Sequence, residues 1–234
     1  MRTVSRDSVP ERLQPNAIPA YLQSTYWWAY VHPRAVRFFE RQWLVNLILW
    51  GNFNRLRDAA LDALGRSVRG RTLQVACVYG NFTAALSQRI APGGTLDVVD
   101  VLPIQLQNLR AKLPASAPVS LHLFDSTALG LPDGDYDQAV LFFLLHEQPA
   151  EHRARTLSEA LRVLKPGGRL LIVDYALPRR WNPLRYLWRP LLALLEPFAL
   201  DLWRADIAAW LPPGLNLRRE TFFGGFYQKV VVTR

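Results

Sequence analysis

The chain has 234 residues, of which half are apolar and 20% are charged, so it can bury a sizeable core. This composition excludes a disordered tail and a fibrous protein. Lysine and arginine outnumber aspartate and glutamate by 28 to 19, which gives a net charge of +9. That charge suits an anionic surface, and it does not choose between nucleic acid and lipid headgroups. The single cysteine, Cys77, excludes an internal disulfide and favours a reducing compartment.

The N-terminal quarter divides into two parts. We expect residues 1–20 to form a flexible arm and residues 21–66 to form an aromatic helical cap. Within the cap, Pro33 is placed to begin a helix that continues to Trp50. This helix is apolar on most sides near its end, so it is either an interfacial helix or one packed on the core. No apolar run reaches the ~20 residues that a transmembrane helix needs.

Strand and helix patterns alternate regularly in the middle of the chain. Strands are expected at 72–79, 95–101, 119–124, 138–145 and 169–175, and helices at 54–64, 82–90, 103–113 and 151–164. Such alternation predicts an α/β protein with a Rossmann-like, mostly parallel and doubly wound sheet. Residues 177–216 hold four tryptophans and several prolines, which predicts a helical lid insertion. A C-terminal antiparallel hairpin, 217–223 and 226–233, turns at Gly224 and Gly225. We expect residues 67–234 to form one domain.

Four stations along this pattern are placed to hold an adenosyl ligand. The first is the turn L-Q-V-A-C-V-Y-G-N at 73–81, and the second is Asp100, a strand-end carboxylate suited to ribose hydroxyls. Asp125 and Ser126 follow the third strand, where a polar pair can meet an adenine amine. The fourth is the L-K-P-G-G-R-L turn at 164–170. Each station is also an ordinary helix cap or turn, so the predicted ligand site depends on the order of all four along the chain.

These stations resemble class I S-adenosylmethionine-dependent methyltransferases over residues 71–175 and again in the hairpin. The first motif departs from that pattern, because Gln74 replaces an acid and glycine survives only at Gly80. Val78 and Tyr79 add bulk where bare backbone normally meets the ligand.

Several segments closely resemble the rhodoquinone biosynthesis protein family, a divergent branch of these methyltransferases. They are Y-W-W-A-Y-V-H-P, W-L-V-N-L-I-L-W-G-N, V-A-C-V-Y-G, F-L-L-H-E-Q-P and G-G-F-Y-Q-K-V-V-V. The resemblance implies that ubiquinone exchanges a ring methoxy group for an amine. It further implies S-adenosylmethionine as amino donor, Mn²⁺ as an assisting metal, and a part in anaerobic respiration. It also implies a peripheral location on the cytoplasmic face of the inner membrane, with ubiquinone as the lipid substrate.

Two other functions stay open. They are a conventional S-adenosylmethionine-dependent quinone or phenol methyltransferase, and a non-catalytic protein that binds lipid quinones. A nucleic-acid modifier is disfavoured because the apolar segments lack alternating basic and aromatic positions.

The predicted site follows from the stations and the resemblance together. The catalytic candidates are Tyr79, Asp125 and His146. The predicted cofactor contacts are Ala76, Val78, Tyr79, Gly80, Asp100, Val101, Asp125 and Ser126. Asp125, His146 and Glu147 form a candidate metal set, and Trp27, Trp28 and Tyr30 form a candidate substrate wall. His146 and Glu147 are equally well explained as a polar helix entry, and His122 as a histidine satisfied within the core.

Overall fold

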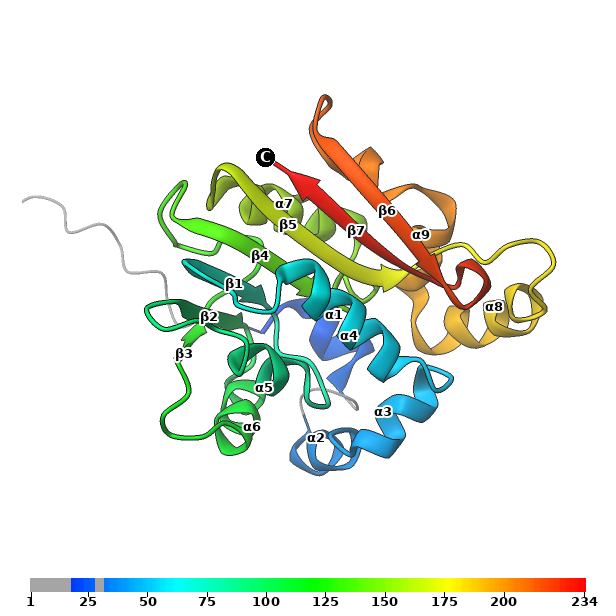
Figure 1. The fold of residues 1–234 in the computed structure, drawn as a ribbon. Helices are drawn as coiled ribbons and strands as arrows, with labels where there is room; N and C mark the ends of the chain where they lie inside the picture. Colours follow the sequence, from blue (N-terminus) through cyan, green and yellow to red (C-terminus); the bar gives the residue numbers. More distant parts are fainter. Residues whose placement is uncertain (1–17, 28–31) are drawn as a thin grey trace, which may run out of the picture.

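A seven-stranded sheet forms the centre of the computed structural model, which describes residues 18–27 and 32–234 (Figure 1). Its strand order is β3-β2-β1-β4-β5-β7-β6. The strands are β1 (Arg71–Val75), β2 (Thr95–Asp100), β3 (Val119–Leu123), β4 (Tyr136–Phe142), β5 (Leu164–Tyr175), β6 (Asn216–Phe222) and β7 (Tyr227–Thr233). Strands β1 to β5 pair in parallel, and β7 runs antiparallel to both β5 and β6. The predicted Rossmann-like fold with a C-terminal antiparallel hairpin is confirmed.

Helices cover both faces of this sheet. They are α1 (Ala20–Thr25), α2 (Pro33–Phe39), α3 (Gln42–Ile48), α4 (Phe53–Leu64), α5 (Phe82–Ser87), α6 (Pro103–Lys112), α7 (Ala150–Arg162), α8 (Leu184–Leu195) and α9 (Asp201–Arg204). Parallel crossovers are right-handed, and the chain moves outward from β1 in one direction and from β4 in the other. Helix α7 therefore lies on the face opposite to α4 and α5, as Figure 1 shows.

The main hydrophobic core lies between the central strands and α4. Strand β1 is buried along its length because β2 and β4 flank it and helices cover its faces. Helix α4 contributes Phe53, Leu56 and Leu61 to the same core, so the end of the N-terminal cap packs directly on the sheet. This burial holds the carboxyl ends of the strands together on one side of the sheet. Ligands bind at these ends in such folds.

The N-terminal segment differs from the prediction of one helix continuing to Trp50. Arg41 adopts an extended backbone, with φ −64° and ψ 118°, so the helix breaks into α2 and α3. The break lets both helices face the same cavity, described below. Asn52 and Gly51 then turn the chain into α4.

The predicted lid insertion is helical and lies beside α3. It comprises α8, α9 and the 3-10 helices η3 (Pro197–Leu200) and η4 (Ile207–Trp210). The rings of Trp50 and Trp188 meet edge to face at 5.0 Å, which joins the end of α3 to α8. In the described parts of the chain, no helix is both long and apolar enough to cross a membrane.

Candidate functional site

The turn after β1 lies where the strand order reverses, between β1 and β4. Ligands of doubly wound sheets bind at such a point. Ala76 begins this turn with a left-handed backbone, φ 70°, which costs an L-residue about 1–2 kcal/mol. Because this conformation ends the strand, β1 stops at Val75, and the predicted strand over 72–79 was too long. Gly80, with φ 84°, completes the turn.

Asp100 ends β2 with a buried carboxylate that accepts two backbone hydrogen bonds. Its Oδ2 accepts from the Cys77 amide at 2.7 Å, and its Oδ1 accepts from the Leu102 amide at 2.8 Å. Burial raises the pKa of Asp100 to about 6, although these hydrogen bonds oppose the shift. The group is therefore ionised at neutral pH, as an acceptor for two ribose hydroxyls should be.

Asp100 lines a small cavity of about 50 Å³. Ser126 and Gln148 form another part of its wall, where Gln148 Nε2 donates to Ser126 Oγ at 3.0 Å. Tyr21 and Leu22 of α1 also line it. These donors and acceptors fit an adenosyl group, but this volume holds only a few water molecules. An adenosyl group therefore needs more room than this cavity offers in the structure. The remaining lining residues are Ala76, Cys77, Val99, Val101, Leu102, Gln105, Phe124, Leu144 and Glu147.

A larger cavity of about 420 Å³ lies next to the small one. Its walls are mostly apolar side chains from the N-terminal helices, the turn after β1, the end of β4 and α8. They are Phe39, Val45, Ile48, Leu49, Phe53, Cys77, Val78, Phe142, Phe143, Leu191, Leu192 and Leu195. Its polar members are Tyr79, His146, Glu147, Tyr175 and Glu196. A cavity of this size and composition suits an apolar ring compound.

The two cavities share Cys77 and Glu147 in their walls. Tyr79 and Asp100, which we expected to flank one ligand, line different cavities. One hydrogen bond connects residues of the two cavities. Gln105, which lines the small cavity, donates from Nε2 to the hydroxyl of Tyr79, which lines the larger one, at 3.0 Å. Phe39 stacks on the Tyr79 ring at 6.2 Å, which holds it in place.

His146 and Asp174 form a buried pair beside the larger cavity. Nδ1 of the imidazole lies 2.9 Å from Asp174 Oδ1, and Nε2 lies 3.7 Å from Glu147 Oε1. Burial lowers the pKa of His146, but Asp174, Glu196 and Glu147 together raise it to about 9. His146 is therefore cationic at neutral pH. Sequence reasoning missed Asp174, although its place at the end of the predicted strand 169–175 was a signal.

Asp125 forms a turn and lines neither cavity. Its Oδ1 accepts from the Thr127 amide and from the Thr127 hydroxyl, each at 2.8 Å. Across residues 18–27 and 32–234, no three histidine, cysteine, aspartate or glutamate side chains are arranged to hold a metal ion. His146 and Glu147 approach one another, but Asp125 does not join them. The predicted Mn²⁺ ligand set is thus not formed among the described residues.

Glu40, which sequence reasoning also missed, fastens the N-terminal helices to the turn after β1. Its Oε1 accepts from the Gly80 amide at 3.1 Å and from Lys112 Nζ at 2.6 Å. Asn108 Nδ2 donates to the other oxygen at 2.7 Å. The only signal in the sequence was an isolated acid among the arginines of 34–41. Gly80 thus meets a protein carboxylate and lines neither cavity.

Of the predicted substrate wall, only Trp27 lies among the described residues. Trp27 is 54% exposed and lines neither cavity. Trp28 and Tyr30 lie outside the described residues. Of the predicted cofactor contacts, Ala76, Asp100, Val101 and Ser126 line the small cavity, and Val78 and Tyr79 line the larger one.

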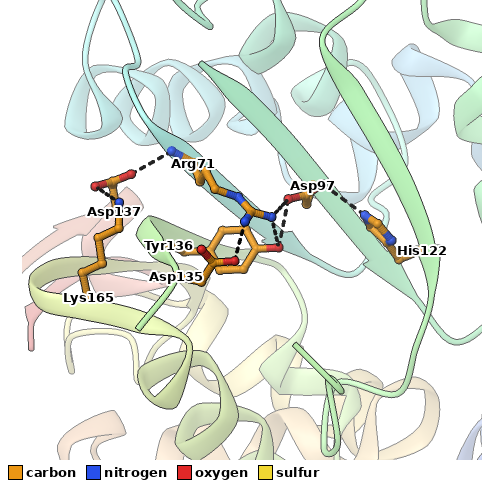
Figure 2. A network of polar contacts seen from close by, with 7 residues as sticks. All are labelled: Arg71, Asp97, His122, Asp135, Tyr136, Asp137 and Lys165. Atoms are coloured by element: carbon orange, nitrogen blue, oxygen red, sulfur yellow. Dashed lines mark hydrogen bonds and ion pairs between the residues drawn. The ribbon is translucent and has the colours of Figure 1, made fainter. Parts of the chain in front are cut away.

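A second polar network joins strands β1, β2, β3 and β4 through residues that line neither cavity (Figure 2). The buried Asp97 accepts from Arg71 Nη2 at 3.0 Å and from the Tyr136 hydroxyl at 2.9 Å, and its Oδ1 lies 3.0 Å from His122 Nε2. Burial raises the pKa of Asp97, but these three hydrogen bonds outweigh it and lower the pKa overall. His122 thus has a hydrogen-bond partner, as expected, but its side chain is 31% exposed and does not lie in the core.

Comparison with known proteins agrees with this geometry. Residues 72–168 match the family model described as a methyltransferase domain. The chain is 30% identical over 139 residues to the ubiquinone/menaquinone biosynthesis C-methyltransferase UbiE of Pseudomonas paraeruginosa, and 31% identical to that of Pseudomonas fluorescens. Each match covers 58% of this chain, which spans about half, 54%, of the relative's length.

Solved structures share the fold. The mitomycin 7-O-methyltransferase MmcR superposes with a TM-score of 0.68 at 20% identity, over 91% of this chain and 61% of that one. A SAM-dependent methyltransferase from Aquifex aeolicus gives 0.53 at 18% identity, over 86% and 98%. Residues 72–168 are thus similar to a methyltransferase domain, and the likeness to the solved structures shows a shared fold. The relatives named above are quinone C-methyltransferases.

Proposed function

We propose that this chain binds S-adenosylmethionine and transfers a group from it to the ring of a lipid quinone. One observation carries the proposal: the small cavity at Asp100 adjoins, through Cys77 and Glu147, an apolar cavity that holds the charged His146. The first cavity suits an adenosyl group, and the second suits a ring with an apolar tail.

We further propose that the transferred group is the amine and that the substrate is ubiquinone, as the resemblance implies. Supporting this, Val78 and Tyr79 form part of the wall of the ring cavity, at positions where the usual motif has small residues. S-adenosylmethionine, when bound, supplies the amino group. A bond forms between nitrogen and the ring carbon, and the methoxy group leaves and takes a proton as methanol. Release of the free ring amine also requires cleavage of the bond between this nitrogen and the donor's α carbon, which balances as an elimination in which the nitrogen gains the proton that the donor's β carbon loses.

Glu147, His146 and Tyr79, which line the larger cavity, have different roles in this reaction. Glu147 lines both cavities, so its carboxylate is our candidate to accept a proton from the attacking amine, in place of Asp125. Cationic His146, held by Asp174, donates from Nε2 to the quinone carbonyl that gains negative charge. The apolar walls exclude water from the ring. Tyr79 has a positioning role through Gln105.

Methyl transfer is the second candidate, and the similarity to the two UbiE proteins favours it. The same cavities would serve, because only the atom presented to the ring differs. The two reactions are distinguished by mass, since methylation raises the mass of the quinone and exchange of methoxy for amine lowers it.

A quinone in a membrane must reach the larger cavity, so we also propose peripheral association with the inner membrane at its cytoplasmic face. Helices α3 and α8 form part of the cavity wall, and both carry exposed apolar side chains. Leu47 is 64% exposed and Leu194 is 78% exposed. Such surfaces insert into the headgroup region of a bilayer.

The deciding experiment incubates the full chain with ubiquinone and S-adenosylmethionine labelled at the amino nitrogen, with Mn²⁺ or with a chelator. Label in a lighter quinone supports amine transfer. Because ubiquinone has no free ring position, a parallel incubation with a quinone that bears one ring hydrogen tests methyl transfer, which gives an unlabelled, heavier product. Loss of turnover with chelator supports the implied metal, and undiminished turnover rejects it. Absence of S-adenosylmethionine binding rejects both reactions and leaves a quinone-binding protein.

Two matched substitutions test the assigned base. Glu147→Gln should lower kcat by about 10²–10⁴-fold, the usual contribution of a general base. Glu151→Gln, on the exposed face of α7, removes the same charge and should leave kcat unchanged. Equal activity of the two variants would reject Glu147 as the base.

A further inference from the structure

A third cavity, of about 520 Å³, lies in the lid insertion and shares no residue with the two described above. Four arginines line it: Arg180 precedes α8, Arg185 and Arg189 lie on α8, and Arg204 ends α9. The other lining residues are Leu177, Tyr186, Leu200 and Trp203. The insertion therefore gathers four guanidinium groups, separated in sequence by up to 24 residues, around one hollow.

The positive charge of this cavity is compensated only in part. None of its lining residues is acidic. Arg204 Nη1 lies 3.3 Å from Asp201, and Arg185 Nη1 donates to the Pro178 carbonyl at 2.9 Å. Within residues 18–27 and 32–234, Arg180 and Arg189 form no ion pair. Like charges held close together repel one another, so this arrangement favours an anion among them.

The insertion that holds this cavity also carries exposed apolar side chains. Trp181 is 70% exposed, and on α8 Leu187 is 68% and Leu194 78% exposed. Tyr186, which lines the cavity, is itself 63% exposed. A soluble phosphate compound would gain nothing from these side chains. A phospholipid would gain from them, because its phosphate contacts the arginines while its acyl region contacts the apolar side chains.

We propose that this arginine cavity binds the phosphate of an anionic phospholipid and so orients the lid on the membrane. Guanidinium groups bind phosphate oxygens in pairs of parallel hydrogen bonds, which explains the use of arginine here. The inference deepens the membrane association proposed above. It is independent of the transfer reaction, because it uses neither the adenosyl cavity nor the ring cavity.

The test measures binding of the full chain to vesicles of phosphatidylcholine, with and without phosphatidylglycerol. Arg180→Gln with Arg189→Gln removes two exposed cavity charges and should weaken binding to the anionic vesicles about 10- to 30-fold. The matched control, Arg66→Gln with Arg69→Gln, removes two exposed charges that lie between α4 and β1. Its binding should change less than about threefold, because those charges lie away from the lid. An equal loss in both double variants, or no loss in the first, would overturn the proposal.

Two further arms separate a lipid phosphate from a soluble one. Leu187→Ser with Leu194→Ser should weaken vesicle binding, since both side chains are exposed and the fold does not depend on them. Inorganic phosphate at millimolar concentration should compete poorly with vesicles. Tight binding of inorganic phosphate, or vesicle binding unaffected by the two serines, would show a soluble-anion site instead. Because no arm uses quinone or S-adenosylmethionine, failure here is distinguishable from failure of the transfer reaction.

Discussion

Asp174 holds the imidazole of His146 in place, with Oδ1 2.9 Å from Nδ1 in the interior beside the ring cavity. Oδ2 of the same carboxylate accepts from the Leu145 amide at 2.8 Å. One side chain thus orients both the ring and the backbone that carries it. This pair makes His146 cationic, which is the state required for polarising a carbonyl oxygen.

Replacing Asp174 by Asn should lower the pKa of His146 from about 9, because the neighbouring negative charge is lost. Titration of the His146 ring protons by NMR measures this directly. Breaking a buried ion pair costs about 3–5 kcal/mol, so the variant should also unfold more easily in urea. A His146 pKa that stays near 9 in the variant would show that Asp174 is not its main partner.

The same pair predicts how stability varies with pH. The folded pKa of His146, about 9, lies above its ordinary value of 6.5, so the folded state binds its proton more tightly. The resulting stabilisation is fully present below pH 6.5 and is lost as pH rises through about 9. Urea unfolding between pH 6 and 10 should show this loss in the unmodified chain. The His146→Gln variant should lack that part of the pH dependence.

Asp100 should make cofactor affinity depend on pH. Its pKa of about 6 is raised by burial, and only its ionised form accepts hydrogen bonds from both ribose hydroxyls. Affinity for S-adenosylmethionine, measured by calorimetry, should therefore fall as pH drops below 6. Asp100→Asn should bind weakly at every pH between 5 and 8. Unchanged affinity in this variant would remove the ribose assignment.

Asp100 should have the opposite effect on stability. Because its folded pKa exceeds its unfolded value of about 3.9, the folded state binds the proton more tightly. Its contribution to the free energy of unfolding should thus decrease as pH rises from about 4 to 6. Comparing the unfolding of the unmodified chain and Asp100→Asn over this range isolates the effect.

Ala76→Gly should stabilise the chain by about 1 kcal/mol. Glycine adopts the left-handed backbone at φ 70° without the steric cost that alanine bears, although it loses more entropy on folding. Ala84→Gly, within α5, is the matched control and should destabilise by roughly 0.5–1 kcal/mol. Denaturant unfolding of both variants makes the comparison. A loss of stability in Ala76→Gly would mean that its methyl packing outweighs the strain.

Asp97→Asn should destabilise the sheet by about 1–3 kcal/mol without changing cofactor affinity. The substitution weakens charged hydrogen bonds from Arg71 and His122 (Figure 2), and none of these three residues lines either cavity. Because hydrogen bonding lowers the pKa of Asp97, its stabilisation is present above about pH 4 and is lost as pH falls through the folded value. Thermal unfolding and calorimetry with S-adenosylmethionine check the two parts separately. A large loss of affinity would contradict the structural role.

Much of the fold was predictable because it depends on local patterns. Alternating apolar runs, together with turn residues such as Gly65 and Gly224, placed most strands and helices within a few residues of their observed ends. The predicted ends of β1 and of the helix beginning at Pro33 were wrong. In both cases the backbone changes next to a residue that tertiary contacts hold: the Cys77 amide donates to Asp100, and Glu40 accepts from Gly80 and Lys112.

Sequence alone established the α/β order, the likeness to a methyltransferase domain and the unusual turn at 75–80, because each is a property of residues close together in the chain. The pairing of His146 with Asp174, the fastening of Gly80 by Glu40 and the arginine cavity of the lid depended on tertiary structure. These groups are 28, 40 and up to 24 residues apart. Packing of the helices against the strand ends brings the first two pairs within hydrogen-bonding distance, and packing within the lid gathers the arginines around one cavity. No local sequence pattern encodes these contacts.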